Sequence, residues 1–159
     1  NGLFGYRQDF FLSMKDEVVL EGLREAITNM APFLTAAVGE DAMIHELSCI
    51  VSDKGSPRQC IHADTIYLPC PQYPDASMSP LYTFFIALQD IDDDMGHTTF
   101  LPQTHTEQAH LLWNSGPRQK EIFITTCKAE MSGLKKGDVA IFDSRILHAG
   151  GANVSDQRR

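Results

Sequence analysis

Hydrophobic positions follow a helical period near the start of the chain. Across residues 14–34 the apolar side chains recur every two to four positions, at Val18, Leu20, Leu23, Ile27 and Met30. This spacing predicts one amphipathic helix with a single apolar face. Pro32 marks its expected end, because proline lacks the N–H that continues a helix and clashes with the preceding turn.

From Ala42 onward the pattern changes to short apolar runs separated by polar turns. The runs are AMIHELSCIV, CIHADTIYL, LYTFFIALQDI, HTTFLP, EIFITTCKAEM, VAIFDS and RILHAGG, and turn clusters such as SDKGSP and SGLKKGD lie between them. Short runs at this spacing are typical of antiparallel strands. The chain is therefore predicted to be mainly β, a sandwich or barrel-like jelly roll with one flanking N-terminal helix.

Length and composition limit the classes of protein to consider. A chain of 159 residues with 43% hydrophobic residues can bury one compact core, so we expect a single domain over residues 1–159. No apolar run approaches the roughly 20 residues of a membrane span. The net charge of -8, with 13 basic and 21 acidic residues, argues against a nucleic-acid surface. A small-molecule partner fits this composition better.

The cysteines and the sequence ends add little. Four cysteines without a CxxC pair favour free thiols over a disulfide framework. No secretory or lipidation motif is visible, and we expect an intracellular protein, cytoplasmic or organellar.

The run QCIHADTIYLPC contains the first candidate chemistry. In an extended strand alternate residues share a face, so His62 and Asp64 would point the same way and could both bind a metal ion. A third ligand could come from His45, His97, His105, His110 or His148. His148 is favoured because an apolar strand ends there, just before a glycine pair that lets backbone approach closely.

Two imidazoles and one carboxylate leave part of a metal's coordination sphere open, which is typical of non-haem Fe(II) oxygenases. Three other interpretations stay open. The His62 and Asp64 pair could be an ordinary hydrogen-bonded pair, or the same three ligands could hold Zn²⁺ in a hydrolase or binding protein. The chain could also be a catalytically inactive scaffold or a subunit of a larger assembly.

Three segments in this order carry a family resemblance: HAD, GHTTFLPQTH and GLKKGDVAIFDSRILHAGGANVSDQRR. Together they resemble the phytanoyl-CoA dioxygenase (PhyH) family of Fe(II)- and 2-oxoglutarate-dependent oxygenases, over about residues 45 to 159. The resemblance implies a double-stranded β-helix, a cupin-like jelly roll. It also implies that residues 1–159 are a truncated core of a longer chain.

The resemblance assigns roles residue by residue. It implies that His62, Asp64 and His148 hold Fe(II). It places an arginine for the distal carboxylate of 2-oxoglutarate eleven residues after the second histidine, at Arg159, with Arg158 as the alternative. Further contacts to 2-oxoglutarate are expected from Thr99, Gln59 and Thr65, and Asn153 is expected to shape a turn.

The implied reaction is the hydroxylation of an aliphatic C–H bond of a small molecule with dioxygen, releasing succinate and CO₂. Related halogenases have a small residue in place of the carboxylate, so Asp64 favours hydroxylation over chlorination. The alternative is the inactive scaffold that keeps the three ligands.

Overall fold

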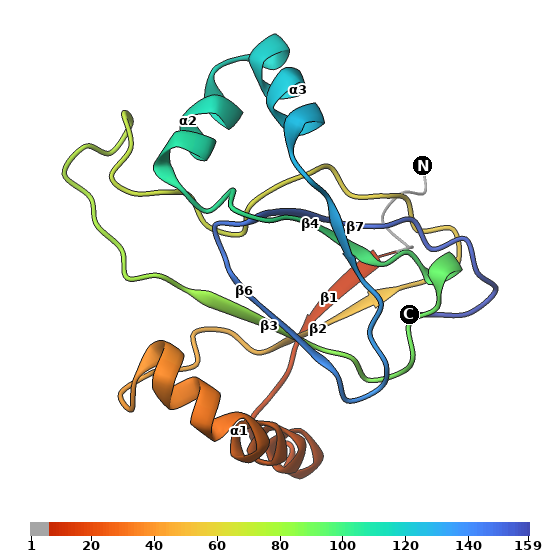
Figure 1. Ribbon diagram of the computed structural model, residues 1–159. Helices are drawn as coiled ribbons and strands as arrows, with labels where there is room; N and C mark the ends of the chain where they lie inside the picture. The colour runs from red at the N-terminus through yellow and green to blue at the C-terminus, as the bar shows by residue number, and fades with distance from the viewer. Residues whose placement is uncertain (1–6) are drawn as a thin grey trace. The chain divides into compact units, whose positions relative to one another are not determined.

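The computed structural model describes residues 7–159, which divide into two compact units, one ending at Val51 and the other running from Ser52 to Arg159. In the first unit the elements are β1 (Arg7–Phe11), α1 (Glu17–Val38) and β2 (Ser48–Ser52), whose last residue opens the second unit (Figure 1). β1 and β2 pair as a two-stranded sheet. The Leu12 amide donates to the Leu47 carbonyl at 3.0 Å and extends this pairing.

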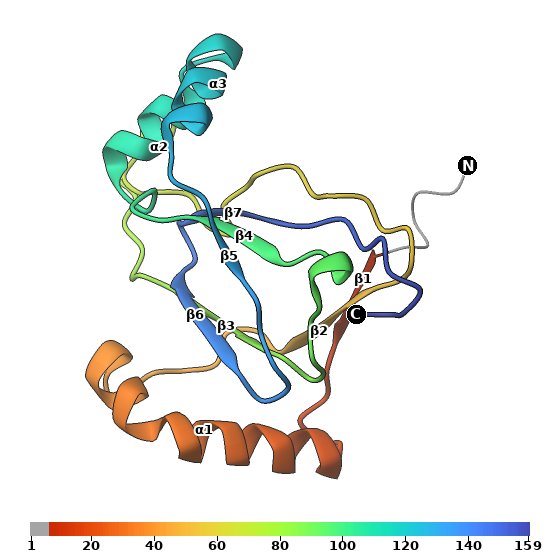
Figure 2. The ribbon, with the colours of Figure 1, turned by 45° about the vertical axis from the view of Figure 1, so that its right-hand side comes forward.

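The helix predicted from the N-terminal pattern is α1, but it does not end at Pro32. Its start is capped by the Asp16 carboxylate, which accepts from the Val18 and Val19 amides at 3.0 and 3.3 Å. It continues past Pro32 to Gly39, where φ is 83°. The proline removes one backbone bond without ending the helix, and the last turns of α1 leave the axis of the first (Figure 2), as at other internal prolines.

The second unit contains two antiparallel sheets. Its elements are β3 (Tyr82–Ile86), the 3₁₀ turn η1 (Asp93–Met95), β4 (Thr98–Leu101), α2 (Glu107–Asn114), α3 (Pro117–Thr126), β5 (Glu130–Ser132), β6 (Val139–Asp143) and β7 (Leu147–Gly150). One sheet pairs β3 with β6, and the other has the order β5-β4-β7. Residues 59–62 run antiparallel along β7, where the Gln59 amide donates to the Gly150 carbonyl at 2.9 Å.

Aromatic rings connect the two sheets. Phe142 is paired with Thr83 in one sheet, and Phe100 is paired with His148 in the other. The ring centroids of Phe100 and Phe142 lie 4.9 Å apart, and those of Phe85 and Phe142 lie 5.1 Å apart. One face of each sheet therefore packs against the other.

The described residues form three α-helices: the expected N-terminal helix is present as α1, but the expectation of a single helix was wrong. Thr106 caps α2 by accepting from the Ala109 amide at 3.3 Å, and Pro117 opens α3 at a position where its missing N–H costs nothing. The run EIFITTCKAEM, predicted as a strand, is helical up to Thr126. The Lys120 ammonium lies 3.3 Å from the centre of the Trp113 ring and links the two helices.

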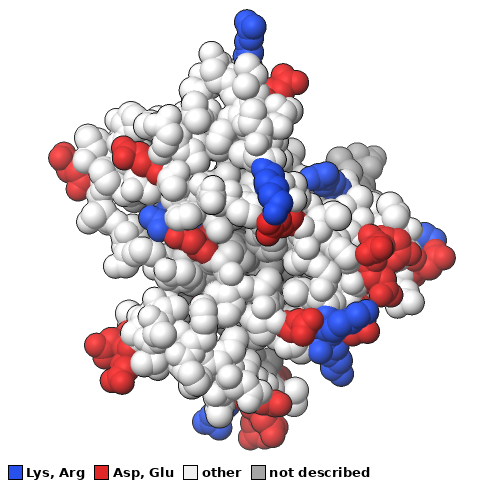
Figure 3. Space-filling view, in the orientation of Figure 1, with Lys and Arg blue, Asp and Glu red and all other residues white. Residues whose placement is uncertain are grey.

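The described helices and surface have features relevant to membrane and nucleic-acid partners. None of these helices combines the length and apolarity needed to cross a bilayer. On the face shown in Figure 3, Lys and Arg side chains stand singly among Asp and Glu, with no continuous basic patch.

Candidate metal centre

Two histidines that are distant in sequence are direct neighbours across a β-bridge. The His62 amide donates to the His148 carbonyl at 2.9 Å, and the His148 amide donates back to the His62 carbonyl at 2.8 Å. Directly opposed residues in an antiparallel pair have their side chains on the same face. The two ring centroids accordingly lie 4.5 Å apart.

Both imidazoles are fixed in one orientation by their own strands. His62 Nδ1 lies 2.9 Å from the Cys60 carbonyl oxygen, and His148 Nδ1 lies 2.9 Å from the Ile146 carbonyl oxygen. A carbonyl can only accept, so Nδ1 carries the proton in each ring and donates it. The unprotonated Nε2 atoms are then the ones available to bind a metal ion.

Asp64 supplies a third ligand atom. Its amide donates to the Ser144 carbonyl at 2.9 Å, and its Oδ1 lies 3.7 Å from His62 Nε2 and 3.5 Å from His148 Nε2. One ligand atom from each residue lies within 4.8 Å of the others. Ligand atoms about 2.1 Å from an ion and at right angles are roughly 3 Å apart, so one ion fits with small side-chain movements.

The apolar surroundings keep His148 uncharged. The imidazole is 3% exposed and packs against Phe142, Phe100 and Phe85, at centroid distances of 5.0, 5.8 and 6.3 Å. Burial lowers the pKa of His148 below its ordinary value, because a charged imidazole is poorly solvated there. A neutral imidazole is the form that binds metals.

Sequence reasoning missed the Thr83 hydroxyl, which contacts the Asp64 carboxylate, and the Ser144 hydroxyl, which contacts Thr83. Thr83 Oγ1 lies 3.2 Å from Asp64 Oδ2 and 2.8 Å from Ser144 Oγ. Thr83 shares a face of β3 with Phe85, because alternate residues of a strand point the same way. Nothing in the sequence alone indicated that Asp64 would be its partner.

A partly buried ion pair shapes the turn that precedes His148. Arg145 donates to the Asp143 carboxylate from Nε at 2.8 Å, from Nη2 at 2.5 Å and from its amide at 2.9 Å, and the Ile146 amide donates to the Asp143 carbonyl. Burial alone would raise the pKa of Asp143, but the hydrogen bonds and charge of Arg145 outweigh it, and the pKa is lowered. The turn fixes where β7 begins.

The other candidate histidines lie outside this centre. His97 Nε2 contacts the Ile91 carbonyl at 3.0 Å, and His110 Nε2 contacts the Arg145 carbonyl at 2.9 Å. His45 is an exposed residue of the first unit. His105 Nδ1 is buried and has no hydrogen-bond partner among residues 7–159. Among the candidates, His148 is the one that meets His62 and Asp64.

The residues expected to contact 2-oxoglutarate lie in three different settings. Thr65 Oγ1, next to Asp64, is buried and has no hydrogen-bond partner within the described part of the chain. Gln59 uses its side-chain carbonyl to accept from the Gly150 amide at 2.8 Å, which leaves its NH₂ group as the possible donor. Thr99 is paired with Ala149 and so lies on the opposite face of β4 from Phe100, away from His148. This placement argues against a direct role for Thr99.

The two arginines at the end of the sequence differ in environment. Arg158 is exposed and donates from Nε to the Asp53 carboxylate at 2.6 Å. Arg159 is half-buried, exchanges backbone hydrogen bonds with Ser52 at 2.7 and 2.8 Å, and donates from Nη1 to the Gly96 carbonyl. Of the two candidates, Arg159 is therefore the half-buried residue and Arg158 the solvent-exposed one.

Asn153 holds the segment that contains Arg159. It is fully buried, and its Nδ2 donates to the Ser52 carbonyl at 2.9 Å and to the Gln157 carbonyl at 2.8 Å. Its Oδ1 accepts from the Ser155 hydroxyl at 2.7 Å and from the Ser155 amide at 3.1 Å. Both polar atoms of its side chain are used, within the turn and to the end of β2, in line with the structural role expected from sequence.

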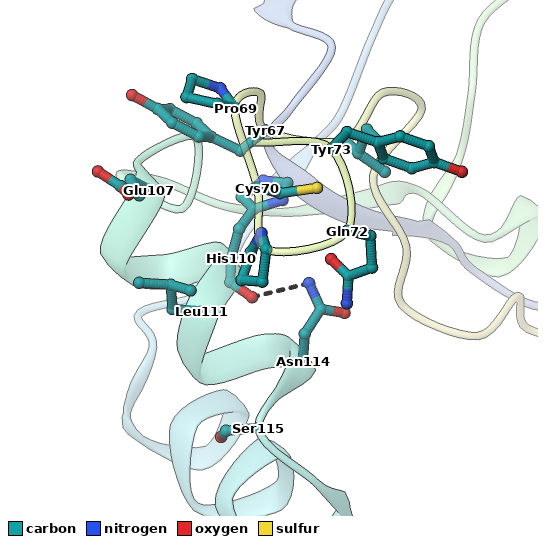
Figure 4. A pocket seen from close by; sticks show the side chains of 12 residues that line it. Tyr67, Pro69, Cys70, Gln72, Tyr73, Glu107, His110, Leu111, Asn114 and Ser115 are labelled. Atoms are coloured by element: carbon teal, nitrogen blue, oxygen red, sulfur yellow. Dashed lines mark hydrogen bonds between the residues drawn. The ribbon is translucent and has the colours of Figure 1, made fainter. Parts of the chain in front are cut away.

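Two pockets differ in their relation to the metal centre. The larger, about 570 Å³, lies between the loop of residues 66–73 and α2, with Tyr67, Tyr73 and His110 among its lining residues (Figure 4). The metal-centre residues do not line it. The smaller, about 350 Å³, is lined by Phe100 and Phe142, whose rings contact His148. His62, Asp64 and His148 do not line the smaller pocket either, so it adjoins the centre only through these two rings.

Two facing antiparallel sheets and the segment beside β7 bring two imidazoles and one carboxylate together, which defines a class of candidate 2-His-1-carboxylate metalloproteins. The chain belongs to the phytanoyl-CoA dioxygenase (PhyH) family, whose model matches residues 7–159. A comparison with curated proteins finds no match.

Several solved structures share the fold. SnoN, described as a non-heme alpha ketoglutarate dependent epimerase from nogalamycin biosynthesis, is 19% identical, with a TM-score of 0.67 over 100% of this chain and 60% of that one. AviO1 from Streptomyces viridochromogenes Tue57 is 18% identical, with a TM-score of 0.67 over 97% and 62%. SnoK, a carbocyclase from nogalamycin biosynthesis, is 20% identical, with a TM-score of 0.54 over 72% and 46%. The chain thus spans less than two thirds of each.

Proposed function

We propose that this chain is the catalytic core of an Fe(II)- and 2-oxoglutarate-dependent dioxygenase that hydroxylates an aliphatic C–H bond of a small molecule. The observation that carries the proposal is the convergence of one ligand atom each from His62, Asp64 and His148 within 4.8 Å, with both Nδ1 protons held by backbone carbonyls. The set of one carboxylate and two neutral imidazoles suits Fe(II) and leaves positions for other ligands.

The residues around the centre fit the co-substrate as well as the metal. When bound, iron with 2-oxoglutarate supplies dioxygen activation, with succinate and CO₂ as products. Thr65 places a buried, unpartnered hydroxyl beside Asp64, as a donor for a carboxylate would be placed. Arg159 has the planar fork that pairs with a distal carboxylate. To do so its guanidinium would exchange its contact with the Gly96 carbonyl for the co-substrate.

The substrate is proposed to lie against the phenylalanine wall beside His148. Phe100 and Phe142 exclude water from one side of the centre, and the adjoining pocket continues along Ile146 and Met131. An apolar wall holds a C–H bond near the metal without competing ligands. On this proposal the sheets are part of a double-stranded β-helix, residues 1–159 form one domain, and that domain is the core of a longer protein.

Asp64 favours hydroxylation among the outcomes open to such a centre, because its carboxylate occupies the position that a halide would need. SnoK and SnoN are described as a carbocyclase and an epimerase. The outcome is therefore tested by the mass of the product. Hydroxylation adds one oxygen atom to the substrate, whereas epimerisation leaves the mass unchanged and ring closure removes two hydrogens.

The proposal is tested by loading the purified protein anaerobically with Fe²⁺ and 2-oxoglutarate and recording the visible spectrum. A weak metal-to-ligand absorption band from the chelated keto acid is expected, and admitting O₂ should release succinate. The band should be missing from His148→Ala and present in His45→Ala, an exposed histidine of the first unit. Metal binding with Zn²⁺ favoured and no succinate would support the hydrolase alternative, and metal binding without turnover would support the scaffold.

A further inference from the structure

Asp64 is partly exposed, yet its carboxylate must keep one orientation to bind a metal. Its side chain is 35% exposed, against 3% for His148. Both imidazoles are held by backbone carbonyls. The carboxylate is held by the Thr83 hydroxyl on β3, which in turn contacts the Ser144 hydroxyl directly after β6.

The direction of these hydrogen bonds follows from counting protons. A carboxylate only accepts, so Thr83 must give its single hydroxyl proton to Asp64 Oδ2, at 3.2 Å. Ser144 must then donate its own proton to Thr83 Oγ1, at 2.8 Å. The two hydroxyls form a chain pointing toward the carboxylate, in which each donor polarises the next.

Ser144 ties this chain to the backbone of the metal-binding segment. Its carbonyl accepts from the Asp64 amide at 2.9 Å and from the Thr65 amide at 3.1 Å, and its own amide donates to the Leu81 carbonyl at 2.9 Å. Ser144 is 3% exposed. One buried residue therefore fixes the backbone of residues 64–65 and, through Thr83, the carboxylate.

The two oxygens of Asp64 consequently have different partners. Oδ2 accepts from Thr83, whereas Oδ1 faces both imidazole Nε2 atoms at 3.5 and 3.7 Å. We propose that Thr83, oriented by Ser144, is a positioning residue that restricts Asp64 to binding the metal through Oδ1 alone. This keeps the coordination positions beside the carboxylate open for co-substrates. The inference rests on the proposed function, since it concerns the same centre.

The test is a titration with Co²⁺ alone, in the absence of 2-oxoglutarate and O₂, because the visible bands of Co²⁺ report both affinity and coordination. Thr83→Val keeps the shape of the side chain and removes the donor. It should weaken binding roughly 10- to 100-fold and shift the bands, as the loss of an outer hydrogen-bond partner does. Thr83→Ser restores the hydroxyl and should restore affinity and spectrum. Thr125→Val, the same change on exposed α3, should match the parent.

An unchanged affinity and spectrum in Thr83→Val would overturn the proposal, and so would a Thr83→Ser variant as weak as Thr83→Val. If Thr83→Val fails to fold, as judged by its thermal melt, Ser144→Ala decides. Ser144→Ala leaves the Thr83 hydroxyl in place but removes the group that orients it. If this variant binds Co²⁺ with the affinity and spectrum of the parent, the proposal is contradicted. A parent that binds Co²⁺ but never forms succinate with Fe²⁺ contradicts the proposed function and leaves this test valid. A parent that binds no Co²⁺ overturns both.

Discussion

His62 and His148 exchange both of their backbone hydrogen bonds, at 2.9 and 2.8 Å, although 85 residues separate them. This pair sets the spacing of two of the three metal-ligand candidates by backbone geometry. The side chains then need only the rotamers that their Nδ1 contacts already select. The centre is therefore organised before any ion binds.

Replacing either histidine by alanine should remove metal binding, with different effects on stability. His148→Ala leaves a cavity among three phenylalanine rings and should lower the free energy of unfolding by about 2–4 kcal/mol. The His62 side chain is 39% exposed, so His62→Ala should lower the free energy of unfolding by less than about 1 kcal/mol. Each should weaken metal affinity by more than the roughly 100-fold typical of losing an outer partner. Urea unfolding and Co²⁺ titration measure both, and equal stability losses would contradict the packing described.

The ion pair of Asp143 and Arg145 should make stability depend on pH. The folded-state pKa of Asp143 is lowered, so between that pKa and the ordinary value near 3.9 the unfolded chain binds more protons. The pair's contribution is therefore complete above about pH 5 and is lost as pH falls through the folded pKa. Asp143→Asn should cost about 1–3 kcal/mol at neutral pH.

The measurement is urea unfolding of the parent and Asp143→Asn at several pH values from neutral down to about 3. The difference between them should shrink steadily in the acid range. Asp75→Asn, at an exposed aspartate in the loop before β3, provides the control and should follow the parent. A difference that stays constant with pH would contradict the assignment to this carboxylate.

Alanine substitutions at Gly96 and Gly22 should have opposite effects on stability, because the first glycine is crowded by backbone and the second is not. At Gly96, where φ is 79°, a Cβ would lie 2.3 Å from the Ala152 carbonyl oxygen. Gly96→Ala should therefore destabilise by more than about 2 kcal/mol. Gly22, in the interior of α1, has nothing within 4 Å, and Gly22→Ala should stabilise by about 0.5–1 kcal/mol. Thermal melts of the two variants should move in opposite directions.

The glycine pair that follows His148 also has a different role from the expected one. A Cβ at Gly151 would lie 2.8 Å from Gly96 backbone, and the Gly151 amide donates to the His97 carbonyl at 3.0 Å. The close approach predicted from sequence thus occurs between two backbone segments of this chain. Sequence can indicate that a glycine is needed for proximity, but it does not name the neighbour.

The metal-ligand candidates could be predicted from sequence because histidines are few in this chain and their spacing relative to other residues is informative. A histidine and an aspartate two residues apart, and a histidine before paired glycines, stand out in an apolar context. Thr99 shows the limit of such reasoning. Whether a strand residue faces the centre depends on register, and a shift of one position reverses every side chain. Thr83 and Ser144 belong to common residue types whose partner is defined only by the fold.

The helices were harder to predict for a related reason. The residues IFITT in α3 are β-branched or aromatic and favour strands by propensity, yet they lie on a helix opened by Pro117 and packed on α2. Tertiary packing overrides weak local preference. Thr106 followed by Glu107 and Ala109 was a readable start signal for α2, and it was missed because turn residues surround it.

Asn153 should be among the residues most sensitive to substitution. Asn153→Ala removes two donors and one acceptor from a fully buried site and leaves the Ser52 and Gln157 carbonyls without that partner. The expected loss in the free energy of unfolding is about 3 kcal/mol or more. Asn114→Ala, at an exposed asparagine with one contact to the His110 carbonyl, should cost under about 1 kcal/mol. Similar losses in urea unfolding would contradict the role of the buried turn.

Arg159 and Arg158 should separate in their effect on 2-oxoglutarate. Arg158 is paired with Asp53 at the surface, where an ion pair contributes little, so Arg158→Ala should leave the KM for 2-oxoglutarate unchanged. Arg159→Ala should raise that KM at least roughly tenfold, because a bidentate charged contact is lost. Arg159→Lys should recover only part, since an ammonium cannot reproduce the planar fork.

The control for Arg159 is metal binding in the absence of 2-oxoglutarate, which its substitution should not change. Because Arg159 also donates to the Gly96 carbonyl, the thermal melt of each variant is needed to separate lost folding from lost recognition. If Arg159→Ala binds Co²⁺ with normal affinity but has a raised KM for 2-oxoglutarate, the substitution has impaired co-substrate binding and not metal binding. A raised KM in Arg158→Ala with a normal one in Arg159→Ala would transfer the role to Arg158. Unchanged KM in both would remove the arginine anchor from the proposed site.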